Sequence, residues 1–177
     1  REAYNIFACN GILFNHESPL RGETFVTKKI ISALCKISLS GNGNLYLGNL
    51  YAKRDWGHAK DYVLAMWKML QRKHPKDYVI ASGRQYSVKY FVNLICDILK
   101  IKIYWKGKGI NEKAYWNGKV IISIDKKYFR PTEVDSLLGD SSKARKELRW
   151  KPLYNIRSLA QDMVAEEFKK IHVNKKK

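Results

Sequence analysis

The segment 14–26, Phe-Asn-His-Glu-Ser-Pro-Leu-Arg-Gly-Glu-Thr-Phe-Val, concentrates side chains that could do chemistry within a few positions. A metal site is not favoured, because His16 and Glu17 would point to opposite faces of a strand and no two histidines are spaced four residues apart. Ser18 precedes a proline and lacks the Gly-x-Ser-x-Gly pattern that exposes a nucleophilic serine. Two interpretations remain: a donor-rich loop that binds an anion at a helix start, and a loop of turn-forming and capping residues only.

A second segment with possible binding chemistry, residues 48–61, contains Lys53 and Arg54 just before a predicted helix. The Arg54 guanidinium could bind a diphosphate through two parallel hydrogen bonds, and the positive end of the helix would add to the attraction. Asp55 offers a different interpretation, because it could pair with both cations in a solvated salt-bridge cluster. The segment alone leaves this choice open.

A third segment, residues 128–135, places Arg130 and Glu133 three positions apart around a proline. The arginine could bind a phosphate, and the carboxylate could accept hydrogen bonds from ribose hydroxyls. Each of the three segments is a weak signal on its own. Three donor-rich segments in one α/β chain are less easily dismissed as unrelated surface loops than any one of them, but the residues alone leave both interpretations open.

Length and composition are those of a folded domain. The 177 residues are 45% hydrophobic and 12% aromatic, which suits a chain with a buried core and argues against disorder. No apolar run approaches the roughly 20 residues that a membrane span requires, so no membrane partner is expected. The cysteines, Cys9, Cys35 and Cys96, are far apart and form no Cys-x-x-Cys pair, which predicts neither disulfides nor a zinc site. We therefore expect a cytoplasmic protein without a metal.

The net charge of +18 raises the question of a nucleic-acid partner. It arises from 34 Lys and Arg residues against 16 Asp and Glu residues. Nine of the 34 basic residues are arginines and 25 are lysines, and the lysines are scattered along the chain instead of forming a stripe. Scattered lysine is more typical of a solvated surface than of a phosphate-binding footprint. No nucleic-acid partner is expected, and a basic α/β module that binds nucleic acid stays as the alternative.

Strand and helix patterns alternate along the chain and predict an α/β fold. Strands are predicted at 5–14, 45–50, 78–81, 102–106 and 119–124, with a polar loop between the last two. Helices are predicted at 25–38, 61–70, 87–99 and 140–148, and from Ser158 into the Lys-rich tail. The clearest helical period gives the second helix an apolar face of Val63, Met66, Trp67 and Leu70. Since no Gly-x-Gly-x-x-Gly turn occurs, any cofactor-cradling half of such a fold is expected before Arg1.

Six blocks of the sequence carry a resemblance to known enzymes. The blocks that resemble the GDP-mannose 4,6-dehydratase family, in order and with similar spacing, are 10–19, 25–27, 47–50, 52–62 and 128–135. The block 139–152 is similar to an ending shared more widely by nucleotide-sugar enzymes of the extended short-chain dehydrogenase/reductase family. The runs Asn-His-Glu-Ser-Pro and Lys-Arg-Asp-Trp-Gly-His-Ala are long enough to be specific to the dehydratase. The resemblance covers nearly the whole chain.

The resemblance implies the C-terminal part of a Rossmann-type extended short-chain dehydrogenase/reductase, with a smaller α/β substrate-binding lobe. Residues 1–75 would end the NADP-binding Rossmann domain, interleaved with substrate-binding segments, and residues 76–177 would form mainly the C-terminal lobe. Because the chain starts at Arg1 and not at a methionine, we expect a piece of a longer protein. The family's catalytic Tyr-x-x-x-Lys pair, with its Ser/Thr and Glu, is expected upstream, so this chain would be inactive alone. Tyr86-Ser-Val-Lys89 is one residue short of that spacing and is interpreted as a helix start.

The activity that the resemblance implies is that of a carbon-oxygen lyase. The family converts GDP-mannose to GDP-4-dehydro-6-deoxy-mannose with tightly bound NADP, in the route to GDP-fucose. The implied partners are GDP-mannose and further copies of the complete chain, as a dimer or tetramer. A nucleotide-sugar dehydratase or epimerase with another substrate is the nearest alternative.

Residue roles implied by the resemblance are carried over position by position. His16 and Arg21 resemble NADP contacts, because the family's loop after this strand faces the cofactor. The positions that match substrate-binding residues are Asn15, Lys29, Arg54, Arg130 and Glu133. Two departures occur. Leu20 stands where the family usually has a second arginine, and Lys28 replaces an arginine, which keeps the charge but loses the bidentate fork.

Overall fold

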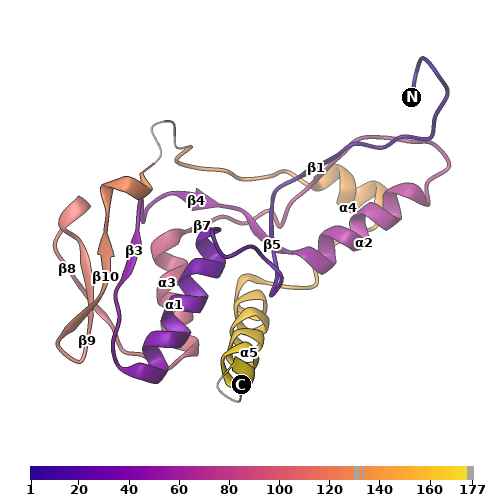
Figure 1. Ribbon diagram of the computed structural model, residues 1–177. Coiled ribbons are helices and arrows are strands. Elements are labelled where there is room, and N and C mark those ends of the chain that lie inside the picture. The colour runs from indigo at the N-terminus through magenta and orange to yellow at the C-terminus, as the bar shows by residue number, and fades with distance from the viewer. Residues whose placement is uncertain (130–131, 133, 175–177) are drawn as a thin grey trace.

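The computed structural model describes residues 1–129, 132 and 134–174 and shows an α/β protein with two hydrophobic cores (Figure 1). The larger core lies between a four-stranded sheet and three helices. The smaller core lies in a thinner arm, at the right in Figure 1, where β1, α2 and α4 are found. Both cores draw on segments from both sides of residue 75, and the two-part division expected near that position stays a prediction.

The larger core is built on a sheet with the strand order β3, β10, β9, β8. Its strands are β3 (Leu45–Leu47), β10 (Lys119–Ile124), β9 (Lys113–Trp116) and β8 (Tyr104–Lys106). β3 runs parallel to β10, and the other neighbours are antiparallel. The helices are α1 (Val26–Ser40), α3 (Val88–Ile98) and α5 (Ile156–Asn174). Each of the three helices contacts the other two, so they pack as one group beside the sheet.

Helix α3 shows how the sequence pattern produces this packing. Phe91, Val92 and Ile95 follow the helical period and are fully buried. Burial of such a side chain contributes roughly 1.5–3 kcal/mol, so the face that they form fixes the helix against the core. The helix begins after Ser87, whose hydroxyl accepts a hydrogen bond from the Tyr90 amide at 3.1 Å. The predicted helix start is therefore confirmed.

The smaller core is covered by a parallel pair of strands, β1 (Gly11–Leu13) and β6 (Tyr78–Ile80). Helices α2 (Ala59–Leu70) and α4 (Ser142–Leu148) pack on one face of this pair. Trp150 closes the core between them. Its indole Nε1 donates a hydrogen bond to the Asp61 carbonyl at 2.8 Å, and its ring meets the Tyr62 ring edge-on at 6.4 Å.

Two short strand pairs join the cores. β2 (Asn15–Glu17) runs parallel to β5 (Trp56–His58), and β4 (Lys53–Arg54) runs antiparallel to β7 (Tyr86–Ser87). Single turns of 3-10 helix lie at η1 (Gly109–Asn111) and η2 (Lys126–Tyr128). The β2 and β5 pairing places the donor-rich segments 14–26 and 48–61 side by side. None of the helices in the described part of the chain is long and apolar enough to cross a membrane.

Several predicted elements are wrong in their bounds or their partners. The segment between β8 and β10, predicted as a loop, contains β9, which is too short and too polar for its alternation to stand out. The last helix begins at Ile156 and not at Ser158, because the Asn155 side chain accepts hydrogen bonds from the amides of Arg157 and Ser158, both at 2.9 Å. The strand predicted at 5–14 is confined to β1.

Helix α2 is where it was predicted, but its apolar face points outward. Val63, Met66, Trp67 and Leu70 are 61%, 40%, 59% and 59% exposed. The side chains that fill the smaller core are instead Tyr62, Ala65 and Met69. The helix is thus apolar on two faces, and only one of them is covered by this chain.

Tyr62 carries a buried hydroxyl that has no hydrogen-bond partner among the described residues. Burial raises the pKa of this hydroxyl, and the charges of Asp55 and Asp61 raise it further, so it stays protonated. A buried unsatisfied polar group costs about 1–3 kcal/mol. We therefore expect Tyr62→Phe to increase the free energy of unfolding by about 1 kcal/mol in urea titrations.

Tyr78→Phe is the matched control for this prediction. The Tyr78 hydroxyl donates a hydrogen bond to Glu147 at 3.0 Å, so its removal should lower the stability. A Tyr62→Phe protein that is less stable than the wild type would contradict the expectation.

Candidate functional site

A central cleft of about 630 Å³ lies where β2, α1, β3 and β4 meet. Three of the residues singled out in the sequence line it: Asn15 from β2, Lys29 from α1 and Arg54 from β4. The start of α1 also borders the cleft, and no side chain caps its first amides. Because these amides carry the positive end of a 15-residue helix, the cleft attracts anions from this side as well.

Two of the three cations that line the central cleft, Lys29 and Arg54, are held by oriented carbonyl groups; the third is Lys127. Lys29 Nζ donates to the Tyr46 carbonyl at 2.6 Å and lies 3.4 Å from the centroid of the Tyr128 ring. Neither of these partners carries a negative charge, so the ammonium keeps its attraction for an anion. Arg54 donates from one guanidinium nitrogen to the carbonyls of Lys53 and Val134, at 2.9 and 2.6 Å. Both cations are thus fixed in place before any ligand arrives.

An apolar pocket of about 440 Å³ adjoins the central cleft and shares Gly48, Asn49 and Phe129 with it. Gly48 allows the end of β3 to approach η2, because a Cβ at this position would lie 2.4 Å from the Tyr128 carbonyl oxygen. Leu50 and Ile110 add to the apolar wall. The two spaces together could take a ligand with a charged middle and a flat apolar end.

Glu17 lies at the inner wall of the central cleft and is only 2% exposed. It accepts a hydrogen bond from the Thr27 hydroxyl at 2.6 Å, and Arg21 Nε lies 3.2 Å from the same oxygen. Burial raises the pKa of the Glu17 carboxyl, while the hydrogen bond from Thr27 and the charge of Arg21 oppose this rise. The carboxylate therefore ties the end of β2 to the start of α1, a role that the sequence did not reveal.

A second cavity of about 310 Å³ holds the predicted cofactor contacts His16 and Arg21, and Asn15 lines it too. His16 Nδ1 lies 2.9 Å from the Phe14 carbonyl, which can only accept, so Nδ1 is the donor of this hydrogen bond and Nε2 faces away from it. The Arg21 guanidinium lies 3.5 Å from the centroid of the Phe25 ring. Its Nε is buried and is ion-paired with the Glu17 carboxylate at 3.2 Å, without the angle of a regular hydrogen bond.

Neighbouring residues of the loop 14–26 thus line two different cavities. Asn15, Lys29 and Arg54 meet in the central cleft, and His16 and Arg21 meet in the second cavity. Their roles in binding stay predictions. The other two predicted substrate contacts, Arg130 and Glu133, lie outside the described residues.

The two positions that depart from the family pattern have different surroundings. Leu20 is 92% exposed at the tip of the loop. Lys28 is 1% exposed, and its ammonium lies 2.7 Å from Glu167 of α5. Lys28 therefore stabilises the packing of α1 on α5, and it does not line the central cleft.

Asp55 does not form the solvated cluster with Lys53 and Arg54 that the sequence left open. It is fully buried, and its carboxylate accepts hydrogen bonds from the amides of Ser82 and Gly83 at 2.8 and 2.9 Å. The Gly139 amide donates to the same carboxylate at 3.4 Å. Asp55 therefore joins two separate loops, at 82–83 and at Gly139, to the segment that carries Arg54.

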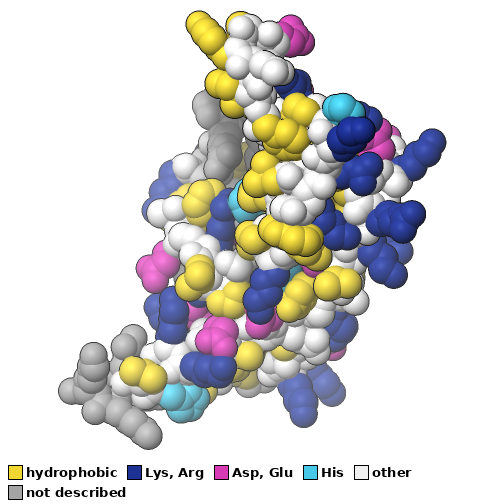
Figure 2. Space-filling model, turned by 90° about the vertical axis from the view of Figure 1, so that its right-hand side faces the viewer, with side chains coloured by type: hydrophobic (Ala, Val, Ile, Leu, Met, Phe, Trp, Pro, Cys, Tyr) yellow, Lys and Arg dark blue, Asp and Glu magenta, His cyan; other side chains and the backbone are white. Residues whose placement is uncertain are grey.

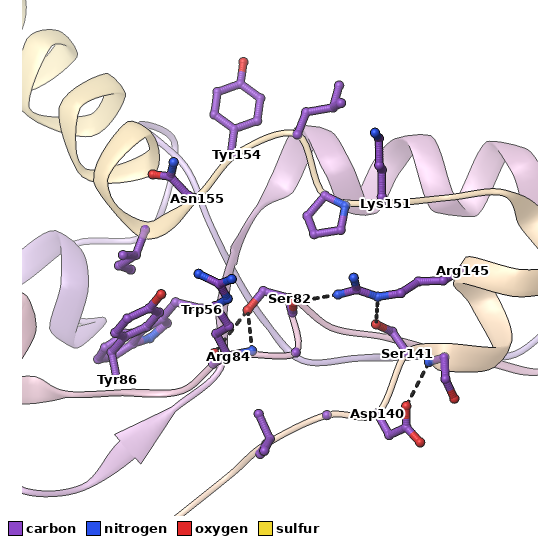
Figure 3. Close-up of a pocket in the computed structure, with 17 residues that line it drawn as sticks. Trp56, Ser82, Arg84, Tyr86, Asp140, Ser141, Arg145, Lys151, Tyr154 and Asn155 are labelled. Atoms are coloured by element: carbon purple, nitrogen blue, oxygen red, sulfur yellow. Dashed lines mark hydrogen bonds between the residues drawn. The ribbon is translucent and has the colours of Figure 1, made fainter.

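A further cavity, of about 740 Å³, shares Trp56 with the central cleft (Figure 3). Its polar wall is internally hydrogen-bonded: Arg145 donates to the Ser82 carbonyl at 2.8 Å and to the Ser141 hydroxyl at 3.2 Å. Part of its wall, including Ser141, Arg145 and Pro152, comes from the block 139–152 that resembles the wider nucleotide-sugar family. Its walls are the loops that Asp55 holds together.

Comparison with known proteins places the chain in a family. The pattern of the family described as GDP-mannose 4,6 dehydratase matches residues 1–163. GDP-mannose 4,6 dehydratase 2 of Caenorhabditis elegans is 52% identical over 168 residues, which are 94% of this chain and 44% of that protein. GDP-mannose 4,6 dehydratase of Drosophila melanogaster is 53% identical over 176 residues, 98% of this chain and 45% of that protein.

The fold is shared with a solved structure of low sequence identity. RMD from Pseudomonas aeruginosa, complexed with NADPH, superposes with a TM-score of 0.72 at 16% identity and covers 91% of this chain and 48% of that one. The predicted Rossmann-type extended short-chain dehydrogenase/reductase fold is confirmed. This chain spans about half the length of the curated relatives it matches. With a family pattern that matches nearly all of its residues, the chain belongs to the GDP-mannose 4,6 dehydratase family.

Proposed function

We propose that this chain is the C-terminal, substrate-holding part of a GDP-mannose 4,6-dehydratase, a lyase that forms GDP-4-dehydro-6-deoxy-mannose. The observation that carries the proposal is the convergence of Asn15, Lys29 and Arg54 on one cleft from three segments of the chain. Family membership supports it. The catalytic Tyr-x-x-x-Lys pair lies in a part of the enzyme that this sequence does not contain, so the chain alone does not turn over GDP-mannose.

Within this proposal the diphosphate of GDP-mannose lies between Lys29 and Arg54. Charge-assisted hydrogen bonds to phosphate are about twice as strong as neutral ones, and both cations are already oriented by carbonyl groups. The guanine then occupies the apolar pocket beside Phe129, whose flat wall suits an aromatic base. Asn15 faces the sugar end, next to the second cavity.

The second cavity suits a nicotinamide cofactor, and we propose NADP. The Arg21 guanidinium borders this cavity, and its ion pair with Glu17, at 3.2 Å from Nε, orients it there; an arginine is suited to bind a phosphate group. His16 donates from Nδ1 to the Phe14 carbonyl, and its Nε2 is left to contact a ligand. When bound, NADP supplies the acceptor and donor of hydride for the family's reaction. The residues of this chain bind and orient it.

We also propose a cytoplasmic setting and a homo-oligomeric complete enzyme. The setting is supported by three free cysteines, of which Cys35 and Cys96 are buried. Burial raises the pKa of both thiols to about 12, which suppresses the reactive thiolate. The oligomeric state rests on the family resemblance alone.

Lys29→Ala and Arg54→Ala are each expected to weaken GDP-mannose binding about ten- to a hundredfold. The reason is that a hydrogen bond to a charged group contributes about 1.5–3 kcal/mol. Isothermal titration calorimetry with the purified chain measures the effect. Lys36→Ala is the matched control, because Lys36 is exposed on α1 away from the cleft and should leave the affinity unchanged. Wild-type affinity in both cleft variants would argue against the diphosphate site.

A further inference from the structure

The four-stranded sheet of the larger core has an outer face that the helices of this chain leave open. Helices α1, α3 and α5 lie together on one side of the sheet (Figure 1). Trp105 of β8 points to that side, because its indole Nε1 donates a hydrogen bond to Asn93 of α3 at 3.0 Å. Its neighbours Tyr104 and Lys106 therefore point to the opposite side, since successive side chains of a strand alternate between faces. Tyr104 is 45% exposed there.

Strand pairing places two rows of side chains on this outer face. One row joins Tyr104 to Tyr115 of β9, whose rings stack at 5.3 Å with an interplanar angle of 9°. The next row joins Lys106 to Lys113, which also lie directly opposite each other. Lys106 Nζ lies 5.5 and 5.8 Å from the centroids of the two rings, so the rings and the ammonium share one face. The outer face thus combines aromatic rings with cations.

The same strands carry an unbalanced positive charge. The segment 102–124 contains one acidic residue, Glu112, which is 3% exposed and ion-paired with Lys89. Its exposed basic residues are Lys102, Lys106, Lys108, Lys113 and Lys119. The side of the molecule that carries α2 differs, because Lys and Arg side chains are mixed there with hydrophobic and acidic ones (Figure 2). The scatter of lysines along the chain argued against a nucleic-acid partner, but folding gathers some of them at this sheet.

Stacked rings beside cations suit single-stranded nucleic acid. Unpaired bases stack on aromatic side chains whatever their sequence, and lysines neutralise the phosphates between them. Four-stranded sheets that bind single-stranded RNA stack two or three bases in this way. Tyr46 of β3, 45% exposed, adds a third ring, because the pairing of Ser123 with both Tyr46 and Lys113 puts all three on the outer face. A duplex hides the faces of its bases, so it cannot use these rings.

We propose that the outer face of this sheet binds single-stranded nucleic acid. The bases stack on Tyr104 and Tyr115, and Lys106 and Lys113 contact the phosphates. None of these four residues lines the central cleft, so the inference does not depend on the proposed function. An acidic peptide would pair with the lysines but would gain nothing from base stacking.

Fluorescence anisotropy tests the proposal with the full 177-residue chain. The probe is a labelled single-stranded RNA of mixed sequence, about 12 nucleotides long, which is within the site size of such surfaces. We expect saturable binding. Tyr104→Ala with Tyr115→Ala should weaken it about ten- to a hundredfold, because the bases lose their stacking partners. Lys106→Gln with Lys113→Gln should lower the slope of log affinity against log salt by about 1.4, the value for two phosphate contacts to a single strand.

Tyr90→Ala is the matched control for the tyrosines, since Tyr90 is 46% exposed and stacks on Tyr86 but lies on α3. Lys36→Gln is the control for the lysines, because Lys36 is exposed on α1. Both should bind the RNA as the wild type does, and thermal unfolding should show that all variants are folded.

Two unlabelled competitors separate the possible ligands: the duplex of the same RNA with its complement, and polyglutamate. Each should compete at least about tenfold less well than the unlabelled single strand. The inference is overturned if the single strand does not bind, if the tyrosine variant binds it as the wild type does, or if either competitor equals the single strand. Failure of the proposed function has a separate sign, because GDP-mannose would then not bind while the RNA still does.

Discussion

Replacing Lys28 by methionine is expected to lower the free energy of unfolding by about 3–5 kcal/mol, because the buried Glu167 carboxylate loses its cation. The two groups lie 2.7 Å apart, and their side chains are 1% and 7% exposed. Lys28 also donates to the Pro19 carbonyl at 3.2 Å, so it joins α1, α5 and the loop that leads into the central cleft. Urea unfolding followed by circular dichroism measures the loss.

The stability loss of Lys28→Met should depend on pH, because the folded protein lowers the pKa of Glu167. Burial alone would raise the pKa of Glu167, but hydrogen bonds from Lys28 and Ser32 hold it below its usual value. A carboxylate whose pKa is lowered by folding contributes stability above its unfolded pKa of 4.5, and this contribution is lost as the pH falls through the folded value. The deficit of Lys28→Met should therefore be largest at neutral pH and shrink in acid.

Two further variants control the Lys28 experiment. Lys36→Met removes an exposed lysine from the same helix and should change the stability by less than about 0.5 kcal/mol. Lys28→Met combined with Glu167→Leu removes both charges and should recover most of the loss, since a buried ion pair can be replaced by apolar groups of similar volume. Equal stability of Lys28→Met and the wild type at neutral pH would show that the pair does not hold the helices together.

Asp55→Ala is expected to cost about 3 kcal/mol or more of stability, because the amides of Ser82, Gly83 and Gly139 lose their common acceptor inside the protein. Asp55 directly follows Arg54, so the loosened backbone should also weaken GDP-mannose binding about tenfold. Unfolding in urea and calorimetric titration measure the two effects separately.

Asp140→Ala is the matched control for Asp55. Its carboxylate is exposed and accepts a hydrogen bond from the Ser142 amide at 2.9 Å, so its loss should lower the stability far less than the loss of the buried Asp55. If Asp55→Ala were as stable as Asp140→Ala, the two loops would not depend on the buried carboxylate. Normal affinity in a destabilised Asp55→Ala protein would leave Asp55 a structural residue only.

Local sequence patterns predicted where helices and strands lie better than they predicted which other elements these pack against. The period of α1 and α3 placed both helices, since packing on one core requires that period. The same reasoning predicted the position of α2. It did not predict which face of α2 this chain buries, because an apolar stripe does not identify the surface that it packs against. β9 was missed because four residues with one buried side chain produce no clear alternation.

The site was predictable only in part, for a similar reason. Donor-rich loops contained Asn15 and Arg54, the family resemblance added Lys29, and the pairing of β2 with β5 brought two of these loops together. Nothing local indicates that Glu17 binds Thr27, or that Asp55 holds loops about 30 and 80 residues away. Such contacts depend on long-range packing, which no local motif contains.

Calorimetric titration of the wild-type chain with GDP-mannose, and separately with duplex DNA, at two salt concentrations tests the central claim most directly. We expect GDP-mannose to bind at one saturable site at both salt concentrations. DNA should bind weakly, through scattered lysines, and lose its affinity steeply as salt rises. Tight binding of DNA with no detectable binding of GDP-mannose would contradict the assignment of the central cleft to a sugar nucleotide.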